Sequence, residues 1–167
     1  MSSLHDIGRA VRDRRTEVGL SQGQLAYLSG LSRQTLAGLE NGTLNDLGFN
    51  RVARVTSVLG LESAPLNTVG HSKKRGLWMA AKTASASCAQ ELSPETLGEA
   101  LVRGEVPPPF VPHLVHLLDE APVQVVVMAV EEAAAGAHVA PKAVWRNVAR
   151  LAQSLSVHRR ALWTSSR

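Results

Sequence analysis

The chain has 167 residues, enough for one large domain or two small ones, and 44% of them are hydrophobic while only 4% are aromatic. Its core therefore has to consist mainly of aliphatic side chains. The single cysteine, Cys88, excludes an internal disulfide and favours a reducing compartment. No apolar run approaches the length of a membrane span, and the N-terminus lacks the apolar segment of a signal peptide. We expect a cytoplasmic protein with no membrane partner.

Charge is distributed unevenly along the chain, although the formal net charge is only +4. Residues 1–75 carry ten Lys or Arg against six Asp or Glu, a balance of +4. Residues 76–157 carry five against eight, a balance of −3, and residues 158–167 carry three Arg and no acid. A basic front and an acidic middle are expected if only the front meets nucleic acid.

Residues 21–42, SQGQLAYLSGLSRQTLAGLENG, predict two short helices joined by a tight turn. Ser21 is a good N-cap, and Gln24 can cap it in return, which is the capping-box pattern. Gly30 stands where the chain has to turn left-handed, a conformation open to glycine because it has no Cβ. Ser32 then caps a second helix that begins with polar residues. A helix, a glycine turn and a helix with a polar front together make a helix-turn-helix layout.

These residues also resemble a known family. The segment LSQGQLAYLSGLSRQTLAGLENG is similar to the helix-turn-helix of the Cro/C1-type (XRE) transcriptional regulators, and the likeness covers roughly Leu4 to Leu61. It rests on the opening Ser-Gln pair, the Leu-Ala that follows, the glycine turn and the Leu-Glu-Asn-Gly exit. The resemblance implies a five-helix, sequence-specific DNA-binding domain that usually works as a dimer, in a bacterial protein. The alternative is an αα-hairpin that only packs, but packing alone would not need so polar a front.

An apolar stripe with helical spacing predicts a first helix over residues 4–18, formed by Leu4, Ile7, Val11 and Val18. Arg15 interrupts this stripe, and an arginine that points toward a core needs a partner because an unpaired buried charge is costly. In the resembled family an arginine at this place pairs with the glutamate of the exit, here Glu40, so we expect an Arg15–Glu40 ion pair. Three further arginines lie off the stripe, open to solvent or to phosphate: Arg9, Arg12 and Arg14.

In this docking mode base edges are reached by the first residues of the second motif helix, here Ser32, Arg33, Gln34 and Thr35. Arg33 can bond bidentately to guanine and Gln34 to adenine. The resemblance makes Arg33, Gln34 and position 38 the base-reading positions. Position 38 is Gly38, which departs from the family's long polar side chain and shifts base reading toward the residues before it. We expect phosphate contacts from residues around the motif, namely Arg9, Arg12, Gln22, Asn41 and Thr43.

After the motif, a helix is expected from about Phe49 to Leu59, with an apolar face that closes a small core: Phe49, Val52, Val55 and Leu59. We place a DNA-binding domain at residues 1–61. Residues 62–76 contain Pro, Gly and Ser without periodicity and are interpreted as a linker, with a short helical turn near Pro65. Its basic cluster, Lys73-Lys74-Arg75, is open either to DNA backbone or to solvent.

Residues 77–156 predict a compact second domain of about five helices. The expected helices, several of which begin at proline, are Leu77–Ser85, Pro94–Arg103, Pro112–Asp119, Val123–Ala135 and a last one that starts at Pro141. The run VQVVVMAV favours a strand by its β-branched content, but its length and its continuation into EEAAA favour a helix. Residues 157–167 are interpreted as a basic tail. The expected fold class is therefore all-α.

No pattern indicates catalysis, and we expect no enzyme, no catalytic residue, no cofactor and no metal site. His113 and His116 have the spacing of half a metal site, but no third ligand is near in sequence, which favours surface histidines. Adjacent carboxylates on a helix do not face each other, so two such pairs are interpreted as solvated charge: Asp119-Glu120 and Glu131-Glu132. The tryptophans are expected to anchor the core: Trp78, Trp145 and Trp163.

The chain is thus predicted to be a transcriptional regulator that binds double-stranded DNA as a homodimer on a palindromic operator. One short helix with two or three base contacts cannot easily reach regulatory specificity, whereas two copies on adjacent half-sites can. The second domain would then serve dimerisation or bind a small-molecule or protein effector. Two alternatives stay open: an antitoxin-like regulator that masks a partner toxin, and a protein-interaction module without DNA reading.

Overall fold

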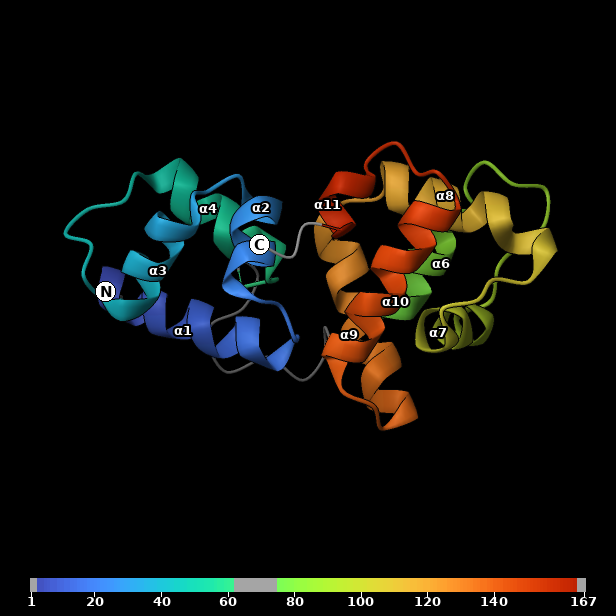
Figure 1. Ribbon diagram of the computed structural model, residues 1–167, viewed down its shortest axis with the longest axis horizontal. Helices are drawn as coiled ribbons and strands as arrows, with labels where there is room; N and C mark the ends of the chain where they lie inside the picture. Colours follow the sequence, from blue (N-terminus) through green and yellow to red (C-terminus); the bar gives the residue numbers. More distant parts are fainter. Residues whose placement is uncertain (1–2, 62–74, 165–167) are drawn as a thin grey trace.

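The computed structural model describes residues 3–61 and 75–164, which form ten α-helices, one short 3-10 helix and no strand. The predicted all-α class is confirmed. Figure 1 shows two helical bodies side by side, an N-terminal domain made by residues 3–61 and a C-terminal domain made by residues 75–164. The turn expected near Pro65 and the basic Lys73 and Lys74 lie outside the described residues.

The N-terminal domain contains four described helices: α1 (Leu4–Glu17), α2 (Gln22–Ser29), α3 (Arg33–Asn41) and α4 (Phe49–Val58). Capping explains where they begin. The Ser21 hydroxyl accepts from the backbone N–H of Gln24 at 3.1 Å, and the Gln24 amide oxygen accepts from the Ser21 N–H at 2.8 Å. The predicted capping box is therefore present. Gly30 ends α2 in the left-handed conformation, with φ of 71°.

An aliphatic cluster fills the space between these helices, and its fully buried members include Val11, Val18, Leu25, Leu36, Leu39, Val55 and Leu59. Phe49 does not belong to it, because 83% of its surface is exposed. The prediction that Phe49 faces the core is wrong. Phe49 lies six residues before Val55, which on a helix places the two side chains about 120° apart around the axis.

The C-terminal domain contains α6 (Gly76–Ser85), α7 (Pro94–Arg103), the 3-10 helix η2 (Pro108–Phe110), α8 (Val111–Glu120), α9 (Val123–Ala137), α10 (Pro141–Ser154) and α11 (Arg160–Thr164). Helix α9 is central, packing against α6, α7 and α10. Its valine-rich half is buried from Val125 to Val130. The choice of helix over strand for this segment is confirmed, because neighbours on three sides cover a helix that is apolar almost all round.

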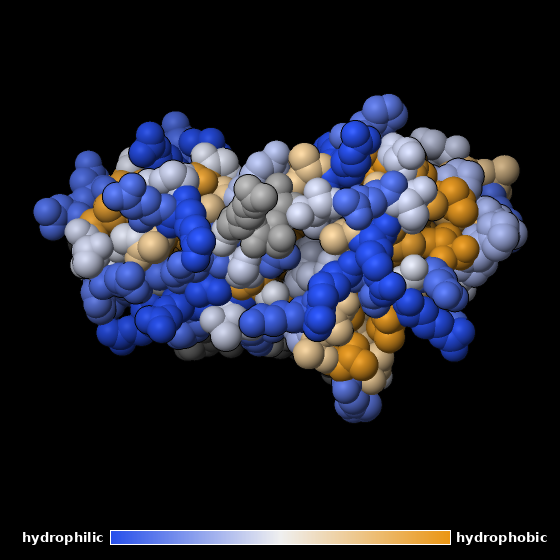
Figure 2. Space-filling model, viewed as in Figure 1, coloured by the Kyte–Doolittle hydropathy of each residue, from blue (hydrophilic) through white to orange (hydrophobic). Residues whose placement is uncertain are grey.

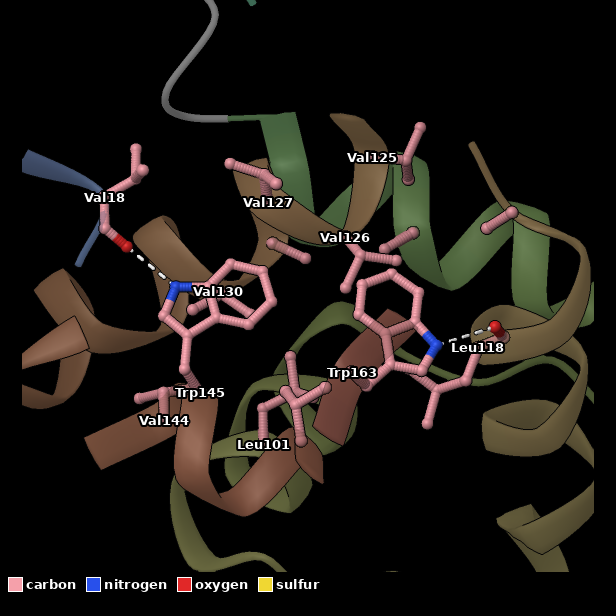
Figure 3. Close-up of a cluster of buried hydrophobic side chains, with 14 of the residues drawn as sticks. Val18, Leu101, Leu118, Val125, Val126, Val127, Val130, Val144, Trp145 and Trp163 are labelled. Atoms are coloured by element: carbon pink, nitrogen blue, oxygen red, sulfur yellow. Dashed lines mark hydrogen bonds between the residues drawn. The ribbon is translucent and has the colours of Figure 1, made fainter. Parts of the chain in front are cut away.

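Residues 157–164 form part of the folded domain, which corrects their interpretation as a tail. Val157 is fully buried, and α11 brings Trp163, 3% exposed, against Trp145 with their ring centroids 6.5 Å apart. Figure 3 shows the two indoles among the valines of α9. The indole N–H of Trp163 donates to the Leu118 carbonyl at 3.0 Å. Trp78 is the exception among the expected core tryptophans, because it lies 52% exposed on α6.

Candidate nucleic-acid interface

Helix α3 begins with a polar surface whose backbone is held by its own cap. The Ser32 hydroxyl accepts from the Thr35 backbone N–H at 3.0 Å and lies 2.8 Å from the Thr35 hydroxyl. One of the two hydroxyls donates to the other, and the hydrogen of the accepting hydroxyl stays available. Their mutual contact fixes the first turn of α3 and leaves the two long side chains between them, Arg33 and Gln34, to reach outward.

Arg33 and Gln34 are both exposed. Neither side chain has a hydrogen bond or an ion pair with any residue of the described ranges. An arginine fork and a glutamine amide are the groups that bond bidentately to guanine and adenine in the major groove. The front of α3 thus presents two unengaged base-reading groups next to each other.

Gly38, one turn further along α3, lies beneath the loop that follows the helix. A Cβ at this position would lie 3.0 Å from the Leu44 side chain and 3.4 Å from the Thr43 hydroxyl. Thr43 also donates to the Gly38 carbonyl, from its backbone N–H at 3.0 Å and from its hydroxyl at 3.3 Å. A Cβ at position 38 would require the Leu44 side chain to move by a few tenths of an ångström. The glycine leaves no side chain to extend the polar front of α3.

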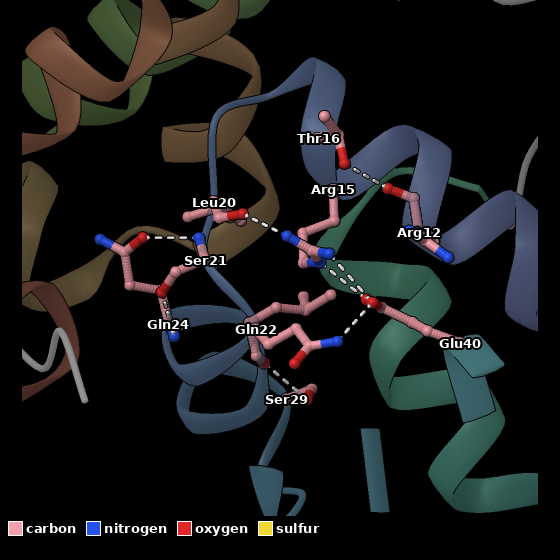
Figure 4. A network of polar contacts seen from close by, with 10 residues as sticks. Arg12, Arg15, Thr16, Leu20, Ser21, Gln22, Gln24, Ser29 and Glu40 are labelled. Carbon is pink, nitrogen blue, oxygen red and sulfur yellow. Dashed lines mark hydrogen bonds and ion pairs between the residues drawn. The ribbon is translucent and has the colours of Figure 1, made fainter. Parts of the chain in front are cut away.

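An ion pair between α1 and the end of α3 holds the motif from behind (Figure 4). The Arg15 guanidinium donates to both Glu40 oxygens, at 2.7 and 2.9 Å, and to the Leu20 carbonyl at 2.9 Å. Arg15 and Glu40, which the family resemblance pairs, are therefore in contact. The Gln22 amide donates to the same carboxylate at 2.8 Å. A phosphate contact from Gln22 would consequently use its backbone N–H at the start of α2 rather than its side chain.

The remaining residues expected on phosphate are exposed at the surface of the N-terminal domain: Arg9, Arg12, Asn41 and Thr43. The guanidinium groups of Arg9 and Arg12 make no hydrogen bond with a described residue. They are free to approach a phosphate in the way the sequence suggests. Arg14, which also lies off the apolar stripe, differs from these two because its guanidinium is engaged.

Arg14 links the two domains. Its guanidinium donates to both oxygens of Glu131 on α9, at 2.8 and 2.6 Å, and to the Leu59 carbonyl at 3.1 Å. The side chains of Arg14 and Glu131 are each only 10% exposed. Burial alone would lower the pKa of Arg14, but Glu131 and Glu17 more than offset it and raise that pKa above its ordinary value. The interpretation of Glu131 as solvated charge is therefore wrong, because its position in α9 turns it toward α1.

Two further contacts join the α1–α2 turn to α10. The indole N–H of Trp145 donates to the Val18 carbonyl at 2.8 Å (Figure 3). Gly19 has φ of +77°, and a Cβ there would lie 2.6 Å from the Pro141 Cβ and 2.9 Å from the Lys142 backbone nitrogen. Position 19 thus requires glycine for two reasons: the left-handed backbone conformation and the close approach of α10. The C-terminal domain holds the helix-turn-helix body at the turn that leads into α2.

The remaining observations concern His113, metal binding and membrane-spanning helices. His113 is buried, 3% exposed, with Nε2 lying 2.6 Å from the Gln90 carbonyl, so it is not the surface histidine expected from sequence. Within the described ranges no group of three or more His, Cys, Asp or Glu could hold a metal ion. None of the helices described is both long and apolar enough to cross a bilayer.

Comparison with known proteins supports the reading of the N-terminal domain. Residues 6–68 match the family model of a helix-turn-helix domain. The match begins two residues inside α1, continues through α2, α3 and α4, and includes both partners of the Arg15–Glu40 pair. No curated protein and no solved structure matches the chain. The chain is therefore an all-helical protein with an N-terminal helix-turn-helix domain, and a domain of this kind indicates a DNA-binding regulator.

Proposed function

We propose that the protein is a sequence-specific transcriptional regulator of the Cro/C1 (XRE) type, which places α3 in the major groove of an operator. The observation that carries this proposal is the pair Arg33 and Gln34, exposed and without a hydrogen bond to described residues at the capped start of α3. Side chains with this chemistry at the start of a recognition helix read guanine and adenine.

The rest of the motif supplies position rather than sequence information. Arg9, Arg12, Asn41 and Thr43 are exposed and bind backbone phosphates in this proposal. The backbone N–H groups at the start of α2 add a further phosphate site, because a helix N-terminus attracts anions. Ser32 and Thr35 hold the first turn of α3 and add short-range contacts to bases. We assign the protein a binding role and no catalysis, in the cytoplasm of a bacterial cell.

A homodimer on a palindromic operator completes the proposal. Two base-reading side chains give too little discrimination against a genome of competing sites, and two copies spaced one helical turn apart multiply it. Analytical ultracentrifugation of the free protein and of its DNA complex tests this directly. A sedimenting species of one chain in both samples would rule out the dimer.

The proposed function is tested by fluorescence anisotropy on duplex DNA from upstream of the protein's own gene, across a salt series. Wild type should bind that fragment more tightly than a scrambled duplex of equal length, and Arg33→Ala should abolish the difference. Arg9→Ala should weaken binding to both duplexes alike and lower the salt slope by about one, as expected for one lost phosphate contact. Equal affinity of wild type for both duplexes at every salt concentration would count against sequence reading at this operator.

A further inference from the structure

A cleft of about 850 Å³ lies where the two domains meet. One wall comes from the helix-turn-helix body and contains Gly19, Ser21 and Gln24, at the turn before α2 and the start of that helix. The opposite wall is α10, with Trp163 and Thr164 of α11 beside it. A recess of this volume, at a junction between domains, has the size and place typical of sites for small organic ligands.

The α10 wall is strongly basic. Lys142, Arg146 and Arg150 line the cleft and are spaced four residues apart, so they share one face of the helix. All three are exposed, and hydrophilic side chains run along the surface over α10 in Figure 2. Among the described residues that line the cleft there is no Asp or Glu. Like charges at this spacing repel one another, so the arrangement costs stability in the absence of an anion.

Two of these cations are unengaged. Arg150 donates to the Asn147 side chain, which itself holds the carbonyls of Leu101 and Val102. Lys142 and Arg146, by contrast, have no hydrogen bond or ion pair with any residue that the structure describes. An ammonium and a guanidinium one turn apart can bind the two oxygens of a carboxylate, phosphate or sulfonate group.

The floor of the cleft is apolar. Ala143 and Ala149 of α10, both half-buried, supply most of its carbon surface, and Trp163, which also lines the cleft but is only 3% exposed, supplies little of it. A hydrated inorganic ion would gain nothing from this floor, whereas a flat organic body would bury carbon surface against it. Basic rim and apolar floor together select a ligand that has both an anionic group and an apolar ring system.

We propose that this cleft is an effector site for a small aromatic or otherwise flat organic anion. The anionic group would lie between Lys142 and Arg146, and the ring system would lie against Ala143, Ala149 and Trp163. Because Ser21 and Gln24 belong to the capping box of α2, an occupant touches the helix-turn-helix body directly. The second half of the proposal, which rests on the proposed DNA-reading function, is that an occupant in contact with α2 changes the affinity of the protein for DNA.

The same cations could meet phosphates of a DNA backbone instead. A backbone phosphate belongs to a DNA duplex, which is too wide to enter the recess and would not contact its apolar floor. The recess favours a ligand small enough to enter it. An experiment without DNA separates the two sources of anion.

The test uses the full chain and a matched pair of dyes. One is the anion 8-anilinonaphthalene-1-sulfonate, and the other is its uncharged parent, N-phenyl-1-naphthylamine, whose fluorescence also rises on apolar burial. Titrations are run on wild type, on the double variant Lys142→Gln/Arg146→Gln, and on Arg51→Gln, an exposed arginine of α4 outside the cleft. Circular dichroism of each variant verifies the fold.

We expect the sulfonate dye to bind wild type and Arg51→Gln alike and to bind the double variant about tenfold more weakly, because two charge-assisted contacts are lost. The uncharged dye should bind wild type weakly and should not distinguish the variants. Equal binding of the sulfonate dye to wild type and the double variant would overturn the site.

A second arm measures operator affinity with and without saturating sulfonate dye. The dye should change the dissociation constant of wild type and leave that of the double variant unchanged. An unchanged wild-type constant would overturn the coupling while leaving the binding site intact. If wild type binds no DNA at all, the proposed function fails, and the dye titration still decides whether the cleft is an anion site.

Discussion

Arg14 and Arg15 are neighbours on α1, and each makes a two-bond ion pair with a glutamate, yet they belong to different regions of the molecule. Arg15 binds Glu40 inside the helix-turn-helix body, at a separation of 25 residues. Arg14 binds Glu131 across the junction of the domains, at a separation of 117 residues. One pair holds the recognition helix to its own domain, and the other holds that domain to its neighbour.

The difference between the two pairs shows which contacts can be predicted from a local sequence pattern and which cannot. Arg15 interrupts an apolar stripe, and its partner stands in the same motif, so a family resemblance can match them. The sequence around Arg14 offers only Glu17, three residues on, as a partner. It does not indicate Glu131, because the position of α9 against α1 depends on the packing of the entire C-terminal domain. Breaking the Arg15–Glu40 pair should therefore destabilise the N-terminal domain itself, whereas breaking the Arg14–Glu131 pair should weaken the link between the two domains.

The largest effect is expected from Glu40→Ala. The Arg15 side chain, only 14% exposed, would lose its carboxylate, and the Gln22 amide would lose its acceptor. We expect the free energy of unfolding to fall by about 4 kcal/mol, as for other broken buried pairs. Urea denaturation followed by circular dichroism measures this. Glu40→Gln, which keeps an acceptor oxygen, is the control and should lose less; a loss below about 1 kcal/mol for Glu40→Ala would contradict the buried-pair description.

Arg14→Met should cost about 3 kcal/mol, because the Leu59 carbonyl loses its donor and the Glu131 carboxylate, only 10% exposed, loses its guanidinium. More telling is the shape of the transition. With the link between the domains weakened, calorimetry should resolve two unfolding transitions where wild type has one. Arg12→Met, the same change at an exposed position of α1, is the control. A single, equally sharp transition in Arg14→Met would show that the junction does not depend on this pair.

Trp145→Phe tests the same junction more gently. The substitution keeps most of the ring but removes the N–H that donates to Val18, and it should cost about 1.5 kcal/mol. Hydrogen exchange should quicken at the α1–α2 turn. Trp163→Phe removes an equivalent bond, to Leu118, inside the C-terminal domain and should leave that turn unchanged. Faster exchange at the turn in both variants would contradict the assignment of Trp145 to the junction.

The smallest effect concerns Asp119, whose carboxylate accepts from the Arg159 backbone N–H at 2.9 Å and lies 3.1 Å from His158. Burial alone would raise the pKa of Asp119, but these two partners outweigh it and hold that pKa below its ordinary value of 3.8. The ionised form thus stabilises the fold above the ordinary value, and this contribution disappears as the pH falls through the lowered pKa.

We therefore expect Asp119→Asn to lower the melting temperature slightly at neutral pH and to match wild type in strong acid. Thermal melting curves of wild type and Asp119→Asn, recorded from neutral pH to strong acid, measure the difference in melting temperature. A gap that widens on acidification would mean that the carboxylate stabilises the fold in its protonated form.

Much of the fold could be predicted because its signals are local. The capping box of Ser21, the left-handed Gly30 and the proline that begins α7 each fix a helix boundary through neighbouring residues. Phe49, Trp78 and Trp163 could not be placed in the same way. All three are large and apolar, but which of them a second element covers depends on contacts between segments far apart in the chain.

The candidate site divides in a similar manner. Its polar front, Arg33 and Gln34, follows from the motif, and their reading of bases stays a prediction. The capture of Gln22 by Glu40 and the place of Gly38 under Leu44 depend on side-chain packing that spacing alone does not reveal. The cleft at the domain junction had no sequence signal beyond three cations spaced four apart on α10.

The most direct test of DNA reading is selection from a pool of random duplexes by wild type, Arg33→Ala and Arg9→Ala in parallel. We expect wild type to enrich one motif, with two similar halves if it binds as a dimer. Arg33→Ala should lose the base preference at one position of each half, and Arg9→Ala should enrich the same motif with lower yield. Enrichment of no motif by wild type, or of an unchanged motif by Arg33→Ala, would contradict the proposal that the start of α3 reads DNA.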